Sequence, residues 1–94
     1  MPKIVYTHTY EKKASKFFKK HPELIKQYEK VLRLLEINPE HPSLRLHHFG
    51  KKSLGLYSIS INMKYRISID FIIEEDQIIP IDIGSHDLIY NDKG

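Results

Sequence analysis

Residues 56–73 alternate between apolar and polar side chains, and this pattern constrains the fold more than any other feature of the chain. The alternation runs through LYSISIN (56–62), and it resumes after a short connection in YRISIDFII (65–73). Successive side chains of a β-strand point to opposite faces, so the pattern predicts two antiparallel strands with one buried and one open face. The buried set is Tyr65, Ile67, Ile69, Phe71 and Ile73, and the open set is Arg66, Ser68 and Asp70.

Three more segments are predicted to be strands. KIVYTH (3–8) alternates and contains β-branched residues, LRLHHF (44–49) precedes a glycine-bounded loop, and IIPIDIG (78–84) ends the patterned part of the chain. Pro80 cannot donate to a strand ladder, which favours an edge position or a bulge for the last of these strands.

Two amphipathic helices are expected between the first and second strands. Thr9 is the predicted cap of the first helix, in which Tyr10, Ala14 and Phe17 recur at helical spacing. Pro22 separates the two helices, because the residue before a proline avoids the helical conformation. The second helix carries a wide apolar stripe and stops at Asn38-Pro39.

The predicted order is therefore β-α-α-β-β-β-β in a single domain spanning residues 1–94. The last four strands have short links, which predicts an antiparallel meander, and the helical hairpin must cover its apolar face. The expected class is a two-layer α+β fold.

Composition excludes several classes of protein. The chain has no cysteine, hence no disulfide framework or thiolate metal site, and no apolar run approaches the roughly 20 residues of a membrane span. The N-terminus lacks the apolar stretch of a signal peptide, and a cytoplasmic location is expected. Charge is uneven: residues 1–20 contain six lysines and one glutamate, while residues 71–94 contain six acids and one lysine. The basic blocks are either solvated faces or a phosphate-attracting surface.

Five side chains on or near the open face suggest chemistry. Arg66 offers a planar fork of donors suited to phosphate, although it could equally pair with an acid across the sheet. His47 and His48 are adjacent on a strand, so only one of them can share the face of Arg66. His86 follows the last strand and is either an acid–base group or a turn residue. Tyr90 could stack on a nucleobase or pack as a hydrophobic plug.

Together these groups could cleave RNA without a metal ion. A histidine would take the proton of a ribose 2′-hydroxyl, the arginine would stabilise the charged phosphorane, and an acid would protonate the leaving 5′-oxygen. Neither a cofactor nor a metal is expected, because zinc-type spacing such as H-E-x-x-H is missing from the sequence.

LRLHHFGKKSLGLYSISINMKYRISIDFI followed by IIPIDIGSHDLIY resembles the toxins of the RelE/ParE superfamily, and it is most similar to the YafQ-like branch. The resemblance covers nearly the whole chain and includes its order of elements. It implies a toxin of a type II toxin–antitoxin system that cuts mRNA in the ribosomal A site and is blocked by a cognate antitoxin.

The resemblance also implies roles for individual residues. His47 would be the general base or a proton-transfer partner, Arg66 the phosphate-stabilising group and His86 the general acid. The substrate would be held by Tyr90, the loop lysines Lys51 and Lys52, and His48 if the register slips by one. Two positions depart from the YafQ-like pattern. Ser60 stands where those enzymes have a second histidine, and Asn62-Met63-Lys64 replaces a segment with an aspartate.

Three functions therefore remain open. The first is a ribosome-dependent mRNA endonuclease, which His47 and His86 favour. The second is a non-catalytic, ParE-like inhibitor of DNA gyrase. The third is a degenerate toxin that acts only as an antitoxin-binding partner, which the missing second histidine favours.

Overall fold

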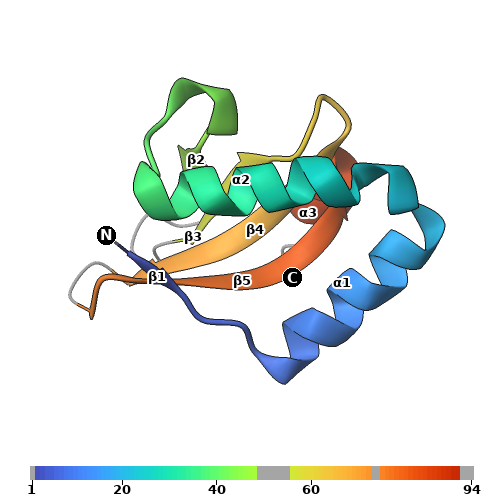
Figure 1. Ribbon diagram of the computed structural model, residues 1–94, viewed down its shortest axis with the longest axis horizontal. Helices are drawn as coiled ribbons and strands as arrows, with labels where there is room; N and C mark the ends of the chain where they lie inside the picture. Colours follow the sequence, from blue (N-terminus) through green and yellow to red (C-terminus); the bar gives the residue numbers. More distant parts are fainter. Residues whose placement is uncertain (1, 49–55, 73–74, 92–94) are drawn as a thin grey trace.

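The computed structural model describes residues 2–48, 56–72 and 75–91 of the 94-residue chain (Figure 1). The predicted basic loop with Lys51 and Lys52 lies outside these residues, as does the side chain of Tyr90. The elements are β1 (Lys3–Ile4), α1 (His8–Lys20), α2 (Ile25–Ile37), β2 (His47–His48), β3 (Leu56–Ser60), β4 (Tyr65–Ile72), β5 (Gln77–Ser85) and α3 (His86–Asn91).

Five strands form one sheet in the order β1-β5-β4-β3-β2. Strands β2 to β5 are the predicted antiparallel meander, and β1 adds to β5 in parallel. The α+β class and the helical hairpin are thereby confirmed. Among the described helices, none combines the length and the apolar character needed to span a bilayer.

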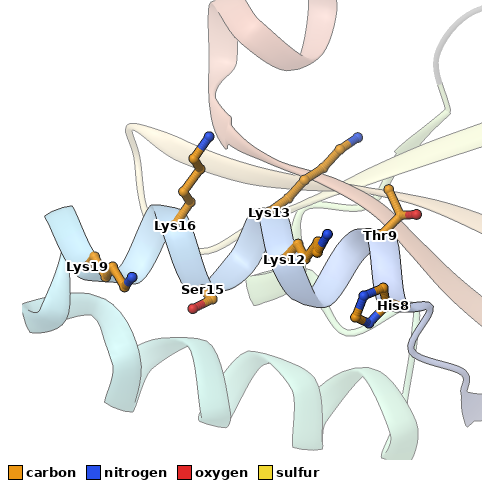
Figure 2. A pocket seen from close by; sticks show the side chains of 7 residues that line it. All are labelled: His8, Thr9, Lys12, Lys13, Ser15, Lys16 and Lys19. Atoms are coloured by element: carbon orange, nitrogen blue, oxygen red, sulfur yellow. The ribbon is translucent and has the colours of Figure 1, made fainter.

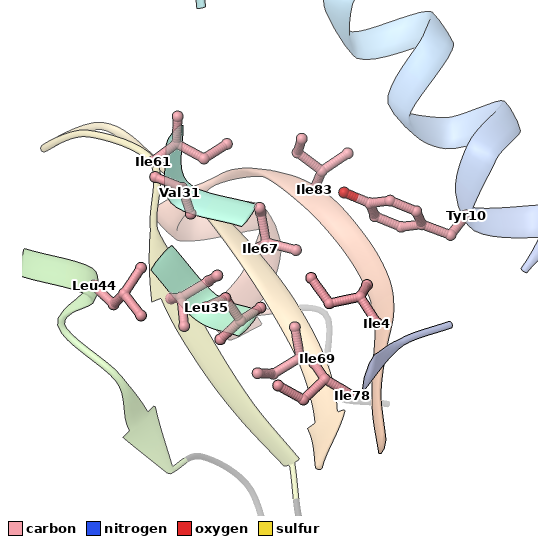
Figure 3. Close-up of a cluster of buried hydrophobic side chains, with 11 residues drawn as sticks. Ile4, Tyr10, Val31, Leu35, Leu44, Ile61, Ile67, Ile69, Ile78 and Ile83 are labelled. Atoms are coloured by element: carbon pink, nitrogen blue, oxygen red, sulfur yellow. The ribbon is translucent and has the colours of Figure 1, made fainter. Parts of the chain in front are cut away.

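One face of the sheet packs against α1 and α2. Figure 1 shows α2 crossing the sheet and α1 lying beside β5. Leu35 and Val31 of α2 and Tyr10 of α1 meet the inward residues of the strands, as predicted from the alternation. The fully or almost fully buried core side chains include Ile4, Tyr10, Val31, Leu35, Leu44, Ile59, Ile61, Ile67, Ile69, Ile78 and Ile83 (Figure 3).

The first strand is shorter than predicted, and α1 starts earlier. β1 ends at Ile4, and Thr7 rather than Thr9 caps α1, since its side-chain oxygen accepts a hydrogen bond from the backbone N–H of Tyr10 at 3.1 Å. A threonine at this position satisfies a donor that the first helical turn leaves without an intrahelical partner. The alternation across 5–8 therefore belongs to the cap and not to a strand.

The segment predicted as strand 44–49 is also largely irregular. Pro42–Leu44 form a short 3-10 turn, and only His47–His48 pair with β3. Between them, Arg45 has φ 50° and ψ 51°, a left-handed conformation that is costly for a residue with a Cβ atom. Leu44, at the end of this turn, is fully buried in the core, and β2 begins two residues after Arg45.

Strand β5 contains a bulge at Ile81. Ser68 pairs with Asp82, but the next residue, Ile69, pairs with Pro80, so Ile81 has no partner on β4. The extra residue changes which side chains point inward: Ile78 and Pro80 are buried before the bulge and Ile83 after it. The sequence-based assignment of Pro80 to an edge or a bulge is thus confirmed.

Helix α3 was not among the predicted elements. It begins directly after β5, and Ser85 Oγ accepts a hydrogen bond from the backbone N–H of Leu88 at 3.2 Å. Gly84 pairs with Arg66, so a side chain there would point to the face opposite the core. Leu88 occupies that space, because a Cβ atom on Gly84 would lie 2.2 Å from Leu88 Cδ2. Helix α3 therefore packs on the open face of the sheet, beside Arg66.

Candidate functional site

A row of polar side chains crosses the open face of the sheet. His47 pairs with Ser58, Ser58 with Ser68, and Ser68 with Asp82, so one residue from each of β2, β3, β4 and β5 shares this face. The open face here means the side of the sheet opposite the helical hairpin. Ser58 and Ser68 are almost fully buried although they are polar.

Arg66 explains part of this burial. It lies in the neighbouring row, between Ser60 and Gly84, and its side chain is only 8% exposed. Its Nε donates to Ser58 Oγ at 3.1 Å, and its Nη2 donates to the carbonyl oxygen of Arg45 at 2.7 Å and to that of Ser58 at 3.4 Å. The guanidinium therefore lies flat across β3 toward the start of β2, held by protein oxygen atoms.

The register of β2 separates the two adjacent histidines. His47 is exposed and shares the face of Arg66. His48 pairs with Tyr57 on the opposite face, where the two rings meet edge-on with centroids 4.9 Å apart. The register does not slip, so His48 does not join the open face.

His86 lies at the end of the open face where β5 passes into α3. Its backbone N–H donates to the carbonyl oxygen of Lys64 at 3.2 Å, which ties it to the connection between β3 and β4. Its side chain is 64% exposed, and Nδ1 lies 3.9 Å from Oδ1 of Asp87. The ring is thus available to solvent at the N-terminal end of a one-and-a-half-turn helix.

The three predicted catalytic residues share a side of the sheet but do not form a compact triad. His47 and His86 are separated by β3 and β4, and by the four residues from Asp82 to His86 along β5. In a flat sheet this offset would put their backbones about 20 Å apart, at about 4.8 Å per strand and about 3.3 Å per residue. Arg66 lies between them, and sheet coiling and side-chain length shorten the gap.

Ser60, at the position of the missing histidine, has a local structural role. It is 7% exposed, and its Oγ donates to the carbonyl oxygen of Asn62 at 2.5 Å. Asn62 Oδ1 in turn accepts from the backbone N–H groups of Lys64 and Tyr65 at 2.9 and 2.8 Å. This stretch therefore builds a tight turn.

Two residues of the site carried no signal in the sequence. Arg45 contributes its backbone carbonyl oxygen, which depends on a left-handed backbone that alternation does not predict. Asp82 reaches the open face only because of the bulge at Ile81. Its Oδ2 lies 3.9 Å from Nζ of Lys13, which links the open face to α1. Within residues 2–48, 56–72 and 75–91, three or more metal-ligating side chains nowhere converge.

Comparison with solved structures identifies the fold. A metal-bound toxin from Helicobacter pylori superposes with a TM-score of 0.76 at 18% identity, over 96% of this chain and 100% of that chain. The Escherichia coli DinJ–YafQ complex superposes with a TM-score of 0.75 at 13% identity, over 96% of this chain and 99% of that chain. The chain has the fold of the YafQ and YoeB toxins.

The match to this fold extends over the whole domain. The YoeB–YefM complex from Staphylococcus aureus gives a TM-score of 0.65 at 16% identity, over 92% of this chain and 98% of that chain. No family model and no curated protein matches the sequence. The expected likeness to YafQ is therefore confirmed at the level of fold.

Proposed function

We propose that the chain is the toxin of a type II toxin–antitoxin system and that it cleaves mRNA on the ribosome without a metal ion. The observation that carries this proposal is the shared placement of His47 and Arg66 on the open face, with His86 at the end of the same face. The YafQ and YoeB fold supports the toxin class. The ribosomal substrate implies the cytoplasm as the site of action.

The proposed reaction is an internal phosphoryl transfer. His47 takes the proton of a ribose 2′-hydroxyl, the 2′-oxygen bonds to the adjacent phosphorus, and the bond from phosphorus to the 5′-oxygen breaks. His86 gives a proton to that leaving oxygen, which yields a cyclic phosphate and a 5′-hydroxyl end. Arg66 stabilises the charge on the phosphorane. Tyr90, Lys51 and Lys52 hold the substrate strand in this proposal, whereas His48 is left out because it lies on the other face.

A base and an acid must each come within hydrogen-bond distance of their substrate oxygens. Because β3 and β4 separate His47 from His86, the two rings have to approach one phosphate from opposite ends of the open face. Catalytic contacts are often looser in a free enzyme than in its substrate complex. Arg66, held between them by Ser58 and Arg45, marks where the phosphate would lie.

The partner is proposed to be a cognate antitoxin. The DinJ–YafQ and YoeB–YefM structures are toxin–antitoxin complexes of this fold. A partner that binds the folded toxin also stabilises it by linkage, so the complex should unfold at a higher temperature than the free chain.

The first test is cleavage of mRNA in a reconstituted translation reaction, with wild type compared to His86→Ala. We expect cuts within translated codons that are strongly reduced in the variant. A substrate with sulfur in place of the leaving 5′-oxygen sharpens the test, since a thiolate leaves without protonation. This substrate should restore cleavage by His86→Ala but not by His47→Ala. Restoration of both variants, or of neither, would contradict the assigned roles.

One observation favours a second function, that of a degenerate toxin that only binds its antitoxin. Arg66 is 8% exposed, and its Nε and Nη2 atoms contact protein oxygens. In that case the wild type would cut no mRNA but would still bind the antitoxin. DNA damage signalling in place of mRNA loss would instead indicate a gyrase inhibitor.

A further inference from the structure

Helix α1 carries a large excess of positive charge. Five of its thirteen residues are lysines, against a single acidic residue, Glu11. Lys12 and Lys16, and likewise Lys16 and Lys20, are four residues apart, and like charges at this spacing destabilise a helix. Within the described parts of the chain, Lys13 is the lysine of α1 that has an ion pair, with Asp82 at 3.9 Å. A local excess of positive charge attracts negatively charged ligands such as phosphates.

All five lysines line hollows in the surface. A groove of about 680 Å³ runs along the outer side of α1 and is lined by polar side chains, among them Lys12, Lys13, Lys16 and Lys19 (Figure 2). A second groove of about 370 Å³ lies between α1 and β5. Lys13, Lys16 and Lys20 line it, together with Asp82. Lys13 and Lys16 belong to both grooves and project on the same side of the helix in Figure 2.

The second groove meets the polar row of the open face at a single residue, Asp82. That row runs from His47 on β2 to Asp82 on β5, and Asp82 borders the groove. The carboxylate of Asp82 is already engaged, since Oδ1 accepts from the backbone N–H of Ile83 at 2.9 Å and Oδ2 lies near Lys13 Nζ. Its charge is therefore partly offset at the point where a polyanion would pass from the sheet to the helix.

We propose that the groove between α1 and β5 binds the phosphate backbone of the RNA strand that crosses the open face. The inference rests on the proposed nuclease function and extends it. Lys16 and Lys20 contact phosphates on one side of the cleaved bond, and the outer groove of α1 prolongs the path. The site therefore engages several nucleotides beyond the one that reacts.

The lining of the grooves favours RNA backbone over a protein partner. Protein interfaces rely on exposed aromatic or aliphatic anchors, and the outer groove is lined by lysine, serine, threonine and histidine. In the groove between α1 and β5, the ring centroids of Phe17 and His21 lie 4.6 Å apart, and each ring also packs on Tyr65. The lysines are thus the groups that reach a ligand, and they contact phosphates without reading bases.

The test measures binding of 2′-O-methyl RNA strands of 4 and 12 nucleotides, which the proposed reaction cannot cleave, by fluorescence anisotropy. Wild type is compared with Lys16→Gln/Lys20→Gln. The matched control is Lys26→Gln/Lys30→Gln, which removes two exposed lysines at the same spacing from α2, away from both grooves. Lys13 is left intact to preserve its pair with Asp82.

We expect the α1 variant to weaken binding of the 12-nucleotide strand and to leave the 4-nucleotide strand unchanged. The slope of log K against log salt for the long strand should become shallower by about 1.4, which corresponds to two phosphate contacts on a single strand. The α2 control should bind like wild type. Equal weakening by both variants, or no weakening by either, would overturn the inference.

The two proposals fail separately. If mRNA is not cleaved in translation while the length-dependent loss in the α1 variant persists, the nuclease function is wrong and the RNA path stands. If cleavage is observed and Lys16→Gln/Lys20→Gln binds the long strand like wild type, the path is wrong and the nuclease function stands.

Discussion

The guanidinium of Arg66 is anchored by the backbone of Arg45, with Nη2 2.7 Å from the carbonyl oxygen. That carbonyl is aimed across the sheet because Arg45 adopts a left-handed conformation at φ 50°. One strained residue in the turn before β2 thus fixes the position of the arginine proposed to meet the phosphate.

This relationship predicts different stabilities for two substitutions of Arg45. Glycine adopts a positive φ freely, so Arg45→Gly should change the free energy of unfolding little. Valine is β-branched and disfavours that conformation, so Arg45→Val should be less stable than Arg45→Gly by about 1–2 kcal/mol. Urea denaturation measures both. Equal stability of the two variants would show that the backbone of residue 45 is not strained.

The two adjacent histidines predict a face-specific effect on activity. His47→Ala should lower mRNA cleavage by about 10²-fold or more, as expected for loss of a general base. His48→Ala should retain cleavage, because its ring packs on Tyr57 on the helix-covered face. The measurement is the rate of codon-specific cleavage with each variant. A larger loss from His48→Ala than from His47→Ala would contradict the observed register.

The close packing of Leu88 on Gly84 predicts that substitutions at these two positions have coupled effects on stability. A methyl group at position 84 would lie 2.2 Å from Leu88 Cδ2, so Gly84→Ala should destabilise the chain by about 1–3 kcal/mol through overpacking. Leu88→Ala alone should cost little because Leu88 is 44% exposed. The double variant should recover most of the loss, and a double-mutant cycle by thermal unfolding measures the coupling. Simple additivity would show that α3 is not seated there.

The buried pair of Tyr10 and Tyr28 predicts alkaline sensitivity. Their hydroxyl oxygens lie 2.9 Å apart, and burial is the main cause that raises the pKa of Tyr10 above its usual 10.0, followed by the effect of Tyr28. A raised pKa means that folded Tyr10 keeps a proton that the unfolded chain releases above pH 10. The contribution of Tyr10 to the free energy of unfolding is therefore fully present below pH 10 and is lost as the pH rises above it. The free energy of unfolding, measured by urea from pH 8 to 11.5, should decline less steeply in Tyr10→Phe. Tyr65→Phe serves as control and should keep the wild-type decline.

Local signals predicted the parts of the fold that depend on them. Proline at position 22 and the Asn38-Pro39 pair bound the helices, and the alternation over 56–62 and 65–73 predicted which face of β3 and β4 packs against them. The alternation repeats over several residues, so it identifies both the strand conformation and which side chains share a face.

Short elements were predicted poorly because their conformation is set by contacts that a local pattern does not contain. The left-handed turn at Arg45 and the cap at Thr7 each depend on one residue, and α3 depends on a glycine that leaves room for Leu88. For the candidate site, alternation predicted that only one of His47 and His48 shares the face of Arg66, and the register of β2 shows that it is His47. The burial of Arg66 and the position of Asp82 on that face did not follow from alternation, because they require the turn and the bulge.

The single extra residue in β5 changes which of its positions face the core. Before Ile81 the even-numbered residues fill the core, and after it the odd-numbered ones do, so that Asp82 and Gly84 are turned outward just before His86. If β5 paired with β4 without the bulge, Ile81 would take the place opposite Ser68, which would turn Asp82 into the core and Ile83 to the open face. The bulge at Ile81 thus determines which face the residues after it reach, and the chemistry proposed for His86 depends on it although no catalytic side chain stands at position 81.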